Sequence, residues 1–199
     1  ESDADDIMKE TEKKVIPMQT ESSSYLYMNE TLFNRVKTLY DNRESSGLTV
    51  EQQKVLEKYY RRFVKGGALL DEEVKARFVE IQNRLGELRV NFAENNLNES
   101  NAYILHVTDI KRLEGLPESQ LEAAATRAKE KNLEGWVFNV QKPCWIPFLQ
   151  YCKDRDLRRQ MYRAYYNRGN NDNEYDNKEI IKETLTLRHE MANILGYET

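Results

Sequence analysis

The stretch DEEVKARFVEIQNRLGELRVNF, residues 71–92, decides the fold of this chain. Its apolar residues recur at alternating steps of four and three, the spacing that aligns side chains along one face of an α-helix. Such a stripe is stabilised mainly by packing against other apolar surface. We therefore expect a long helix that begins at Asp71 and is ended by ENNLNES, residues 94–100. Its core-facing stripe consists of Val74, Phe78, Ile81, Leu85, Leu88 and Phe92.

Helical patterns also fill the sequence before this stretch. Three helices are expected there, over residues 3–28, 29–43 and 49–66. Pro17 is expected to interrupt the first, because proline lacks the N–H group that a helix interior uses. Thr49 can begin the third, with Gln52 at the second position of a capping box. A bundle of helices follows from these patterns.

The pattern changes beyond residue 100. Two segments with alternating apolar and polar residues resemble short strands, and the helix expected between them has Pro117 near its start. Three more helices are expected over residues 143–152, 154–168 and 176–195. We predict a mainly α fold, a multi-helix, bundle-like array with one short two-stranded β element at about 102–108 and 135–140. Along the chain this gives helices over 1–97, short strands and a helix over 98–141, and helices over 142–199.

Composition excludes some classes of protein. The chain has 34 acidic and 30 basic residues, for a net charge of −4, so nothing attracts it globally to nucleic acid. No apolar run approaches the ~20 residues needed to cross a bilayer, and a soluble protein without membrane contact is expected. The sequence begins at Glu1 without an initiator Met or a secretory signal, which suggests a piece of a longer protein.

The segment HEMAN, residues 189–193, differs by one residue from the zinc-binding helix motif His-Glu-x-x-His. Advancing about 100° per residue around the last helix places His189 on its charged face, beside Glu190. Asn193 occupies the place of the second histidine ligand. A catalytic zinc ion needs three protein ligands in a shaped pocket. We therefore interpret His189 as a surface residue and the motif as a coincidence.

Arg188 lies in the middle of the apolar arc of the same helix. A guanidinium group cannot lose its charge, and burial without an acceptor would be severely unfavourable. We therefore expect a carboxylate or carbonyl partner for Arg188.

A second arginine-rich segment, DRDLRRQMYRAYYNRG, residues 154–169, could suggest phosphate contacts. Its helical positions favour a packed helix instead, with Leu157, Met161, Ala164 and Tyr165 on the core side. Arg158 and Arg168 are expected to form ion pairs at its edge, and Arg159 and Arg163 to point away.

The remaining reactive residue types indicate no site. Cys144 and Cys152 are eight residues apart, so on one helix they are too far apart for a disulfide, and they lack the paired spacing of a zinc site. They are interpreted as ordinary thiols. His106 lies in the first expected strand with no partner suggested by the sequence. Phosphate-binding glycine loops and Gly-x-Ser-x-Gly are absent. The residues thus predict no catalytic and no metal-binding side chain here, and they identify no substrate-binding residue.

Four blocks, taken in order, resemble a known family. They are residues 56–100, 111–121, 142–169 and 176–197. They are similar to the N-terminal half of the zinc oligopeptidases, which include thimet oligopeptidase, oligopeptidase A and bacterial peptidyl-dipeptidase Dcp. The segment YNRGNNDNEYDNKEII, residues 166–181, resembles the bacterial peptidyl-dipeptidase branch most.

The resemblance implies a largely helical enzyme with a deep channel that admits short peptides. In that family a His-Glu-x-x-His helix and a later glutamate bind zinc, and the motif's glutamate activates water. None of these elements matches a residue of this chain, so the zinc belongs to the parent enzyme, whose catalytic domain lies outside these residues.

The expected function is therefore scaffold or channel wall of a peptidase that releases C-terminal dipeptides, inactive by itself, in the cytoplasm or periplasm of a bacterium. Its partners are short peptides and the missing catalytic domain. A stand-alone helical interaction module is the alternative.

Overall fold

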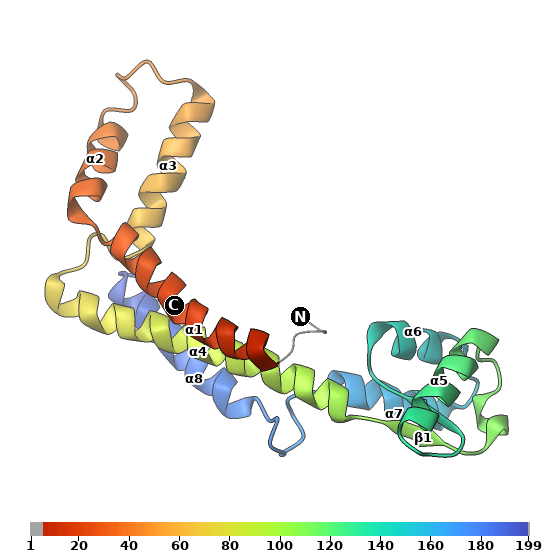
Figure 1. Cartoon of the computed structure of the whole chain (residues 1–199). Helices are drawn as coiled ribbons and strands as arrows, with labels where there is room; N and C mark the ends of the chain where they lie inside the picture. Colours follow the sequence, from red (N-terminus) through yellow and green to blue (C-terminus); the bar gives the residue numbers. More distant parts are fainter. Residues whose placement is uncertain (1–5, 199) are drawn as a thin grey trace. The chain divides into compact units, whose positions relative to one another are not determined.

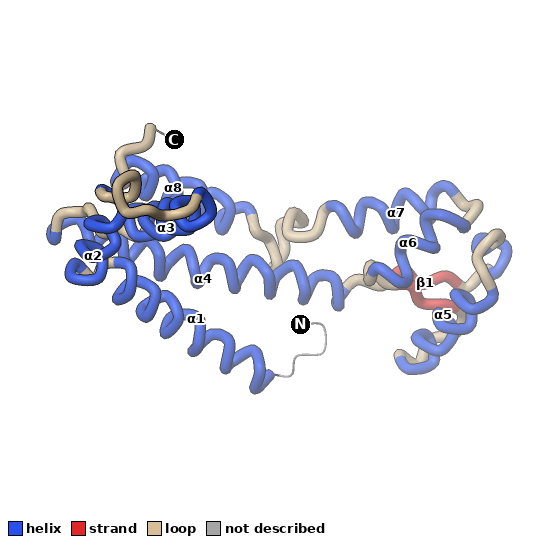
Figure 2. The backbone as a smooth tube through the Cα atoms, turned by 90° about the horizontal axis from the view of Figure 1, so that it is seen from above, coloured by secondary structure: helices blue, strands red, loops and turns tan. Residues whose placement is uncertain are grey.

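A computed structural model describes residues 6–198 and confirms the mainly α fold (Figures 1 and 2). The described residues form eight α-helices, one 3-10 helix and two short strands. They divide into two compact units: one contains the described residues up to Val90 and from Ile180 onward, and the other contains Asn91–Glu179. No described helix is both long and apolar enough to span a membrane.

The first unit contains the helices expected before residue 71. They are α1 (Asp6–Tyr27), α2 (Glu30–Asp41) and α3 (Val50–Lys65), and the first part of α4 (Glu72–Ala102) belongs to the same unit. Thr49 caps α3 through the expected capping box, in which its hydroxyl accepts from the Gln52 N–H and the Gln52 side chain accepts from the Thr49 N–H. The predicted interruption at Pro17 does not occur, because α1 continues through this residue. The expected start at residue 3 lies outside the described residues.

The stripe on α4 packs against α8 (Lys178–Ile194), which lies along it in Figure 1. Phe78 and Ile81 are fully buried and Leu88 is nearly so, as expected for the core side of the helix. Phe92 departs from the prediction, since 38% of its surface is exposed. The partners of this stripe in the α4–α8 core are Ile180, Leu187, Met191 and Ile194.

Two ion pairs reinforce the contact between α4 and α8. Arg77 donates from Nε and Nη2 to the carboxylate of Glu190, at 2.7 and 2.9 Å. Arg84 donates to both oxygens of Glu183 in the same way, at 2.6 and 2.9 Å. The pairing lowers the pKa of both glutamates, with the hydrogen bond from the arginine as the main cause. Both pairs are partly exposed, so they align the helices more than they stabilise them.

Aromatic side chains join α1, α2 and α3. Phe33 and Phe63 are buried, and Tyr27 meets Phe63 edge to face with ring centroids 5.2 Å apart. The end of α3 approaches the end of α1 so closely that a Cβ atom on Gly66 would lie 2.6 Å from the Tyr27 Cβ. Glycine is therefore required at position 66 by packing, because its φ of −82° is open to any residue.

Gly66→Ala and Gly86→Ala are expected to change stability in opposite directions. The new methyl group at position 66 overlaps Tyr27, and overpacking of this kind costs about 1–3 kcal/mol. At position 86, inside α4, the nearest atoms would be 3.6 Å from the new Cβ, which is ordinary contact. Alanine should stabilise that helix by about 0.5–1 kcal/mol. Urea unfolding followed by circular dichroism measures both, and a destabilised Gly86→Ala would contradict the packing described for α4.

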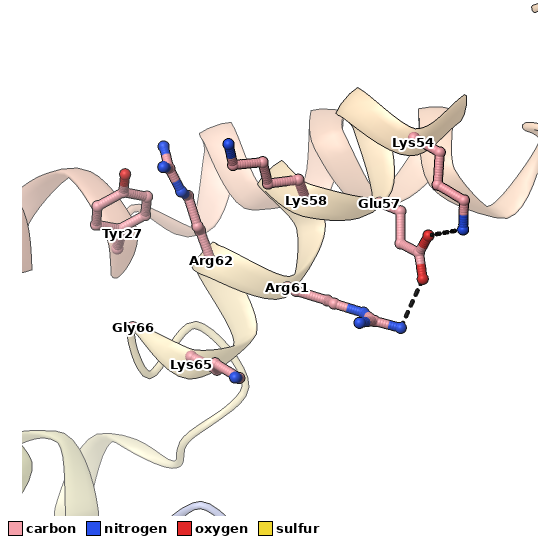
Figure 3. Close-up of a pocket in the computed structure, with 8 residues that line it drawn as sticks. All are labelled: Tyr27, Lys54, Glu57, Lys58, Arg61, Arg62, Lys65 and Gly66. Atoms are coloured by element: carbon pink, nitrogen blue, oxygen red, sulfur yellow. Dashed lines mark hydrogen bonds and ion pairs between the residues drawn. The ribbon is translucent and has the colours of Figure 1, made fainter. Parts of the chain in front are cut away.

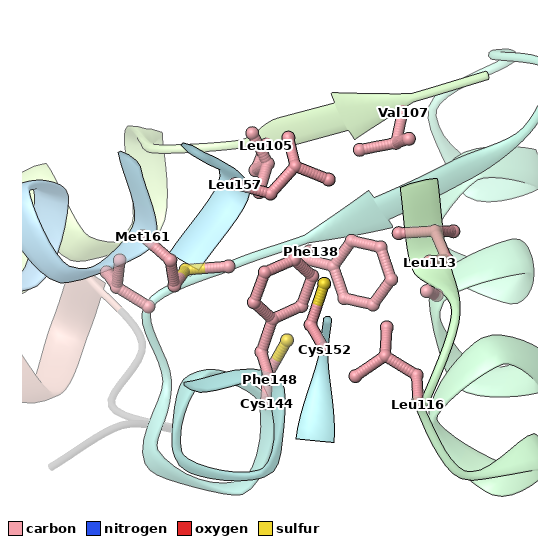
Figure 4. Packing of buried hydrophobic residues seen from close by; sticks show 12 residues of the cluster. Leu105, Val107, Leu113, Leu116, Phe138, Cys144, Phe148, Cys152, Leu157 and Met161 are labelled. Atoms are coloured by element: carbon pink, nitrogen blue, oxygen red, sulfur yellow. The ribbon is translucent and has the colours of Figure 1, made fainter. Parts of the chain in front are cut away.

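The second unit contains the two strands and the helices around them. Strands β1 (Leu105–Val107) and β2 (Trp136–Phe138) form the two-stranded element that the alternating pattern predicted. The structure shows that they pair antiparallel, with His106 opposite Val137. The helices are α5 (Glu118–Glu130), α6 (Lys142–Tyr151) and α7 (Arg155–Tyr166), and a 3-10 helix covers Ile110–Leu113. Figure 4 shows their shared core, where Phe138 meets Phe148 at 4.7 Å between ring centroids.

The end of α4 differs from the prediction. ENNLNES was expected to end this helix, yet α4 runs through it to Ala102. The asparagines there face a later loop: Asn95 donates to the Asn177 side chain at 3.0 Å, and Asn177 donates to the Phe92 carbonyl at 3.3 Å. Side-chain amides that satisfy distant groups in this way no longer compete for the helix backbone. Tertiary contacts thus override a local stop signal.

Candidate functional site

A groove in the first unit is the most strongly charged cavity described (Figure 3). It encloses about 570 Å³ between the end of α1 and one side of α3. Successive turns of α3 supply its cations because they are spaced three or four residues apart. The lining residues are Tyr27, Lys54, Glu57, Lys58, Arg61, Arg62, Lys65 and Gly66.

Glu57 is the acidic residue of this groove and is already paired. Lys54 Nζ lies 2.9 Å from one carboxylate oxygen and Arg61 Nη2 lies 2.6 Å from the other, as the dashed lines in Figure 3 show. These partners lower the pKa of Glu57, the hydrogen bond from Lys54 first and the charge of Arg61 next. Glu57 therefore neutralises part of the positive charge and orients two cations. What remains of the groove is positively charged and open to solvent.

A polar pocket of about 510 Å³ in the second unit is built around Glu99. Only 7% of Glu99 is exposed, and three donors bind its carboxylate. They are the backbone N–H of Gly169 and the side-chain amides of Asn171 and Asn173, the latter two both at 2.7 Å. The loop that follows α7 thus closes over one buried carboxylate. The other residues with polar groups in the lining are Tyr103, Gln160, Arg163, Asn167 and Tyr175.

Burial by itself raises the pKa of Glu99, but the hydrogen bonds from Gly169, Asn171 and Asn173 outweigh it, so that the pKa is lowered. The folded protein then binds the proton more weakly than the unfolded chain does. Glu99 contributes its full stability above the unfolded pKa of about 4.3, and this contribution is lost as the pH falls through the folded value.

We expect Glu99→Gln to remove this acid sensitivity. The variant should also lose about 1–3 kcal/mol at neutral pH, because its amide nitrogen faces donors that need an acceptor. Tryptophan fluorescence reports the unfolding of the second unit, because Trp136 and Trp145 both lie in it. The free energy of unfolding of the wild type and of Glu99→Gln is measured between about pH 3 and pH 6. The same dependence on pH in both proteins would contradict this role of Glu99.

The structure places His189 and Asn193 of the HEMAN segment on the exposed side of α8, while Met191 packs in the α4–α8 core. His189 is exposed, as predicted, and its Nε2 lies 3.2 Å from the Asn193 side-chain nitrogen. Glu190, at the position of the general base in the real motif, binds Arg77 instead. Among residues 6–198 no group of three or more His, Cys, Asp and Glu side chains could hold a metal ion. The described residues therefore do not fit a zinc site.

The expectation for Arg188 was wrong. Its side chain is exposed and makes no hydrogen bond or ion pair within the described part of the chain. The reason is that α4 covers only part of the apolar side of α8. The part with Leu187 packs on α4, whereas Ile181 and Leu185 on the adjacent stripe are 46% and 63% exposed. Arg188 lies in this uncovered stripe, so its charge stays hydrated.

Arginine contacts along α7 also differ from the prediction. Ion pairs were expected for Arg158 and Arg168, but Arg158 donates to the carbonyls of Cys152 and Lys153. Arg168 donates to the Ser100 hydroxyl at 2.9 Å and lies over the Tyr165 ring. Carbonyls just after α6 thus take the place of a carboxylate for Arg158, and a carbonyl of α7 and a hydroxyl do so for Arg168. Leu157, Met161, Ala164 and Tyr165 pack in the core as expected.

The other candidate residues have structural roles. Cys144 and Cys152 are free and buried, and burial raises the pKa of both thiols. His106 is exposed on β1, with Nε2 2.6 Å from the Glu134 carbonyl oxygen. The sequence did not point to the Glu99 pocket or to the groove on α3. For the groove a signal was present, namely basic residues at positions 54, 58, 61, 62 and 65.

Comparisons with known proteins find peptidases among the relatives of this chain. The chain is 34% identical over 195 residues to oligopeptidase A of Escherichia coli (strain K12), and 35% identical over 196 residues to that of Haemophilus influenzae. Each alignment covers 96% of this chain and 29% of the relative. Dipeptidyl carboxypeptidase of E. coli is 30% identical over 178 residues, with 89% of this chain and 26% of that protein covered.

The sequence profile of peptidase family M3 matches residues 148–199. This match and the relatives support the family that the four blocks indicated. It spans less than a third of the length of the relatives named here. Identity is higher to the two oligopeptidases A than to the dipeptidyl carboxypeptidase, so these relatives do not favour the peptidyl-dipeptidase branch that residues 166–181 suggested.

Proposed function

We propose that this chain is the N-terminal scaffold, and part of the substrate-channel wall, of a zinc metallopeptidase that hydrolyses short peptides. The observation that carries the proposal is the extent of the similarity. Nearly the whole chain aligns with oligopeptidases, and the alignment covers 29% of their length. The zinc ligands and the catalytic glutamate would then lie in the remaining part of the parent enzyme, and this chain alone would be inactive.

The role of these residues is to build and hold the wall that a peptide meets. Rigid helices joined by bidentate ion pairs, as between Arg84 and Glu183, fix the surfaces on which side chains are presented. The amide-rich lining of the Glu99 pocket offers donors and acceptors that suit a peptide backbone. Release of C-terminal dipeptides is the proposed reaction, on the strength of residues 166–181 and of the similarity to dipeptidyl carboxypeptidase, with zinc held elsewhere in the enzyme.

Zinc content and peptide hydrolysis, measured for this chain and for the full-length gene product, test the proposal. We expect one zinc ion and chelator-sensitive cleavage of an internally quenched peptide only in the longer protein. Mass spectrometry of the products separates dipeptide release from internal cleavage. Stoichiometric zinc together with chelator-sensitive hydrolysis by these 199 residues alone would overturn the assignment.

One observation favours the alternative of a helical interaction module. The hairpin of α2 and α3 carries an apolar groove of about 480 Å³. Leu39 and Val55 in this groove are 57% and 55% exposed. A full-length gene product without a His-Glu-x-x-His helix and without peptidase activity would support this alternative.

A further inference from the structure

The groove between α1 and α3 carries positive charge that the described residues do not compensate. Lys54 and Arg61 share Glu57, but Lys58, Arg62 and Lys65 have no carboxylate partner within the described part of the chain. All three are exposed, and Arg62 makes only a cation–π contact with Tyr59, 5.5 Å from the ring centroid. Like charges one turn apart on a helix repel each other. An anionic ligand would relieve this repulsion.

We propose that this groove binds an acidic peptide segment in an extended conformation. The cations from Lys54 to Lys65 span eleven helical residues, a length of about 16 Å at 1.5 Å per residue. An extended peptide of about five residues has the same length. The local charge is opposite to the net charge of −4 of the whole chain, so the attraction is specific to this groove.

The shape of the groove favours a peptide over a nucleic acid. Single-stranded nucleic acids bind through a basic track combined with exposed aromatic rings on which bases stack. Tyr27 is the aromatic residue of the lining, and it is already packed against Phe63. Figure 3 shows the cations spaced along α3, with Tyr27 beside Arg62. The groove is complete within this chain, so the inference does not rest on the proposed peptidase function.

Fluorescence anisotropy of a labelled, end-blocked peptide of about five glutamates tests the proposal. The 199-residue chain should bind this peptide, and its affinity should fall as the salt concentration rises from about 50 to 300 mM. A glutamine peptide of equal length should bind at least about tenfold more weakly. Replacing Lys58, Arg62 and Lys65 together by glutamine should weaken binding about tenfold.

A matched control separates this groove from bulk charge. Replacing Lys129, Lys131 and Lys142 by glutamine removes the same three charges from exposed positions of the second unit, and affinity should change less than about twofold. Equal losses in the two triple variants, or equal binding of glutamate and glutamine peptides, would overturn the proposal. Tighter binding of polyphosphate or of a single-stranded oligonucleotide would reject the peptide as occupant. If the triple variant does not fold, Lys58→Glu alone should still weaken binding several-fold.

Discussion

Replacing Phe148 by alanine is expected to lower the free energy of unfolding of the second unit by about 3–5 kcal/mol. The Phe148 side chain is completely buried in the core of this unit and packs edge to face on Phe138 (Figure 4). Truncation removes buried apolar surface and leaves a cavity that rigid neighbours on β2 and α7 fill only in part. A loss of this size is a large fraction of the stability of a small unit.

Ile146→Ala on the same helix is the matched control. Ile146 is 47% exposed, so its truncation removes little buried surface and should cost less than about 1 kcal/mol. Denaturant unfolding followed by tryptophan fluorescence measures both variants, because both tryptophans lie in this unit. Similar midpoints for the two variants would show that Phe148 does not support the core in the way described.

Gly169→Ala is expected to destabilise the loop around Glu99 by about 2–5 kcal/mol. Two costs add. Gly169 has a φ of +72°, a left-handed conformation that costs an alanine about 1–2 kcal/mol. The new Cβ would also lie 2.6 Å from the side-chain nitrogen of the buried Asn177, and overpacking adds about 1–3 kcal/mol. The strain falls on the residue whose N–H binds Glu99.

Two further variants separate these costs. Gly47 has a φ of +65° but no atom within 4 Å of an added Cβ, so Gly47→Ala reports the backbone cost alone. In an Asn177→Ser background the cost of Gly169→Ala should fall, because the shorter side chain leaves room for the methyl group. A double-mutant cycle measures this coupling. Additive effects of the two substitutions would exclude the steric contact as the cause.

Local patterns predicted much of the fold. The capping box of Thr49, the stripe from Phe78 to Leu88 and the two short strands were all visible as spacing. Each depends on residues close together in the chain or on a repeat of fixed period. The exposure of His189 also followed from its position on the helix.

Other features depend on contacts across long sequence separations. Glu99 and Gly169 are 70 residues apart, and nothing local to Glu99 indicates that a loop will bury it. The same contacts carry α4 past its expected end. For the candidate site, the basic residues of α3 were visible in the sequence, but the groove exists only because the end of α1 packs against Gly66.

The sequence by itself thus determined the helices and the small β ribbon and indicated the family, since helix periodicity and ordered sequence blocks are properties of the chain alone. Only the tertiary structure decided which apolar arcs are covered. α8 presents two apolar stripes, and α4 covers the one with Leu187 while Arg188 and Leu185 stay exposed. A helical projection gives the direction of a side chain, but burial depends on whether another element packs on that side.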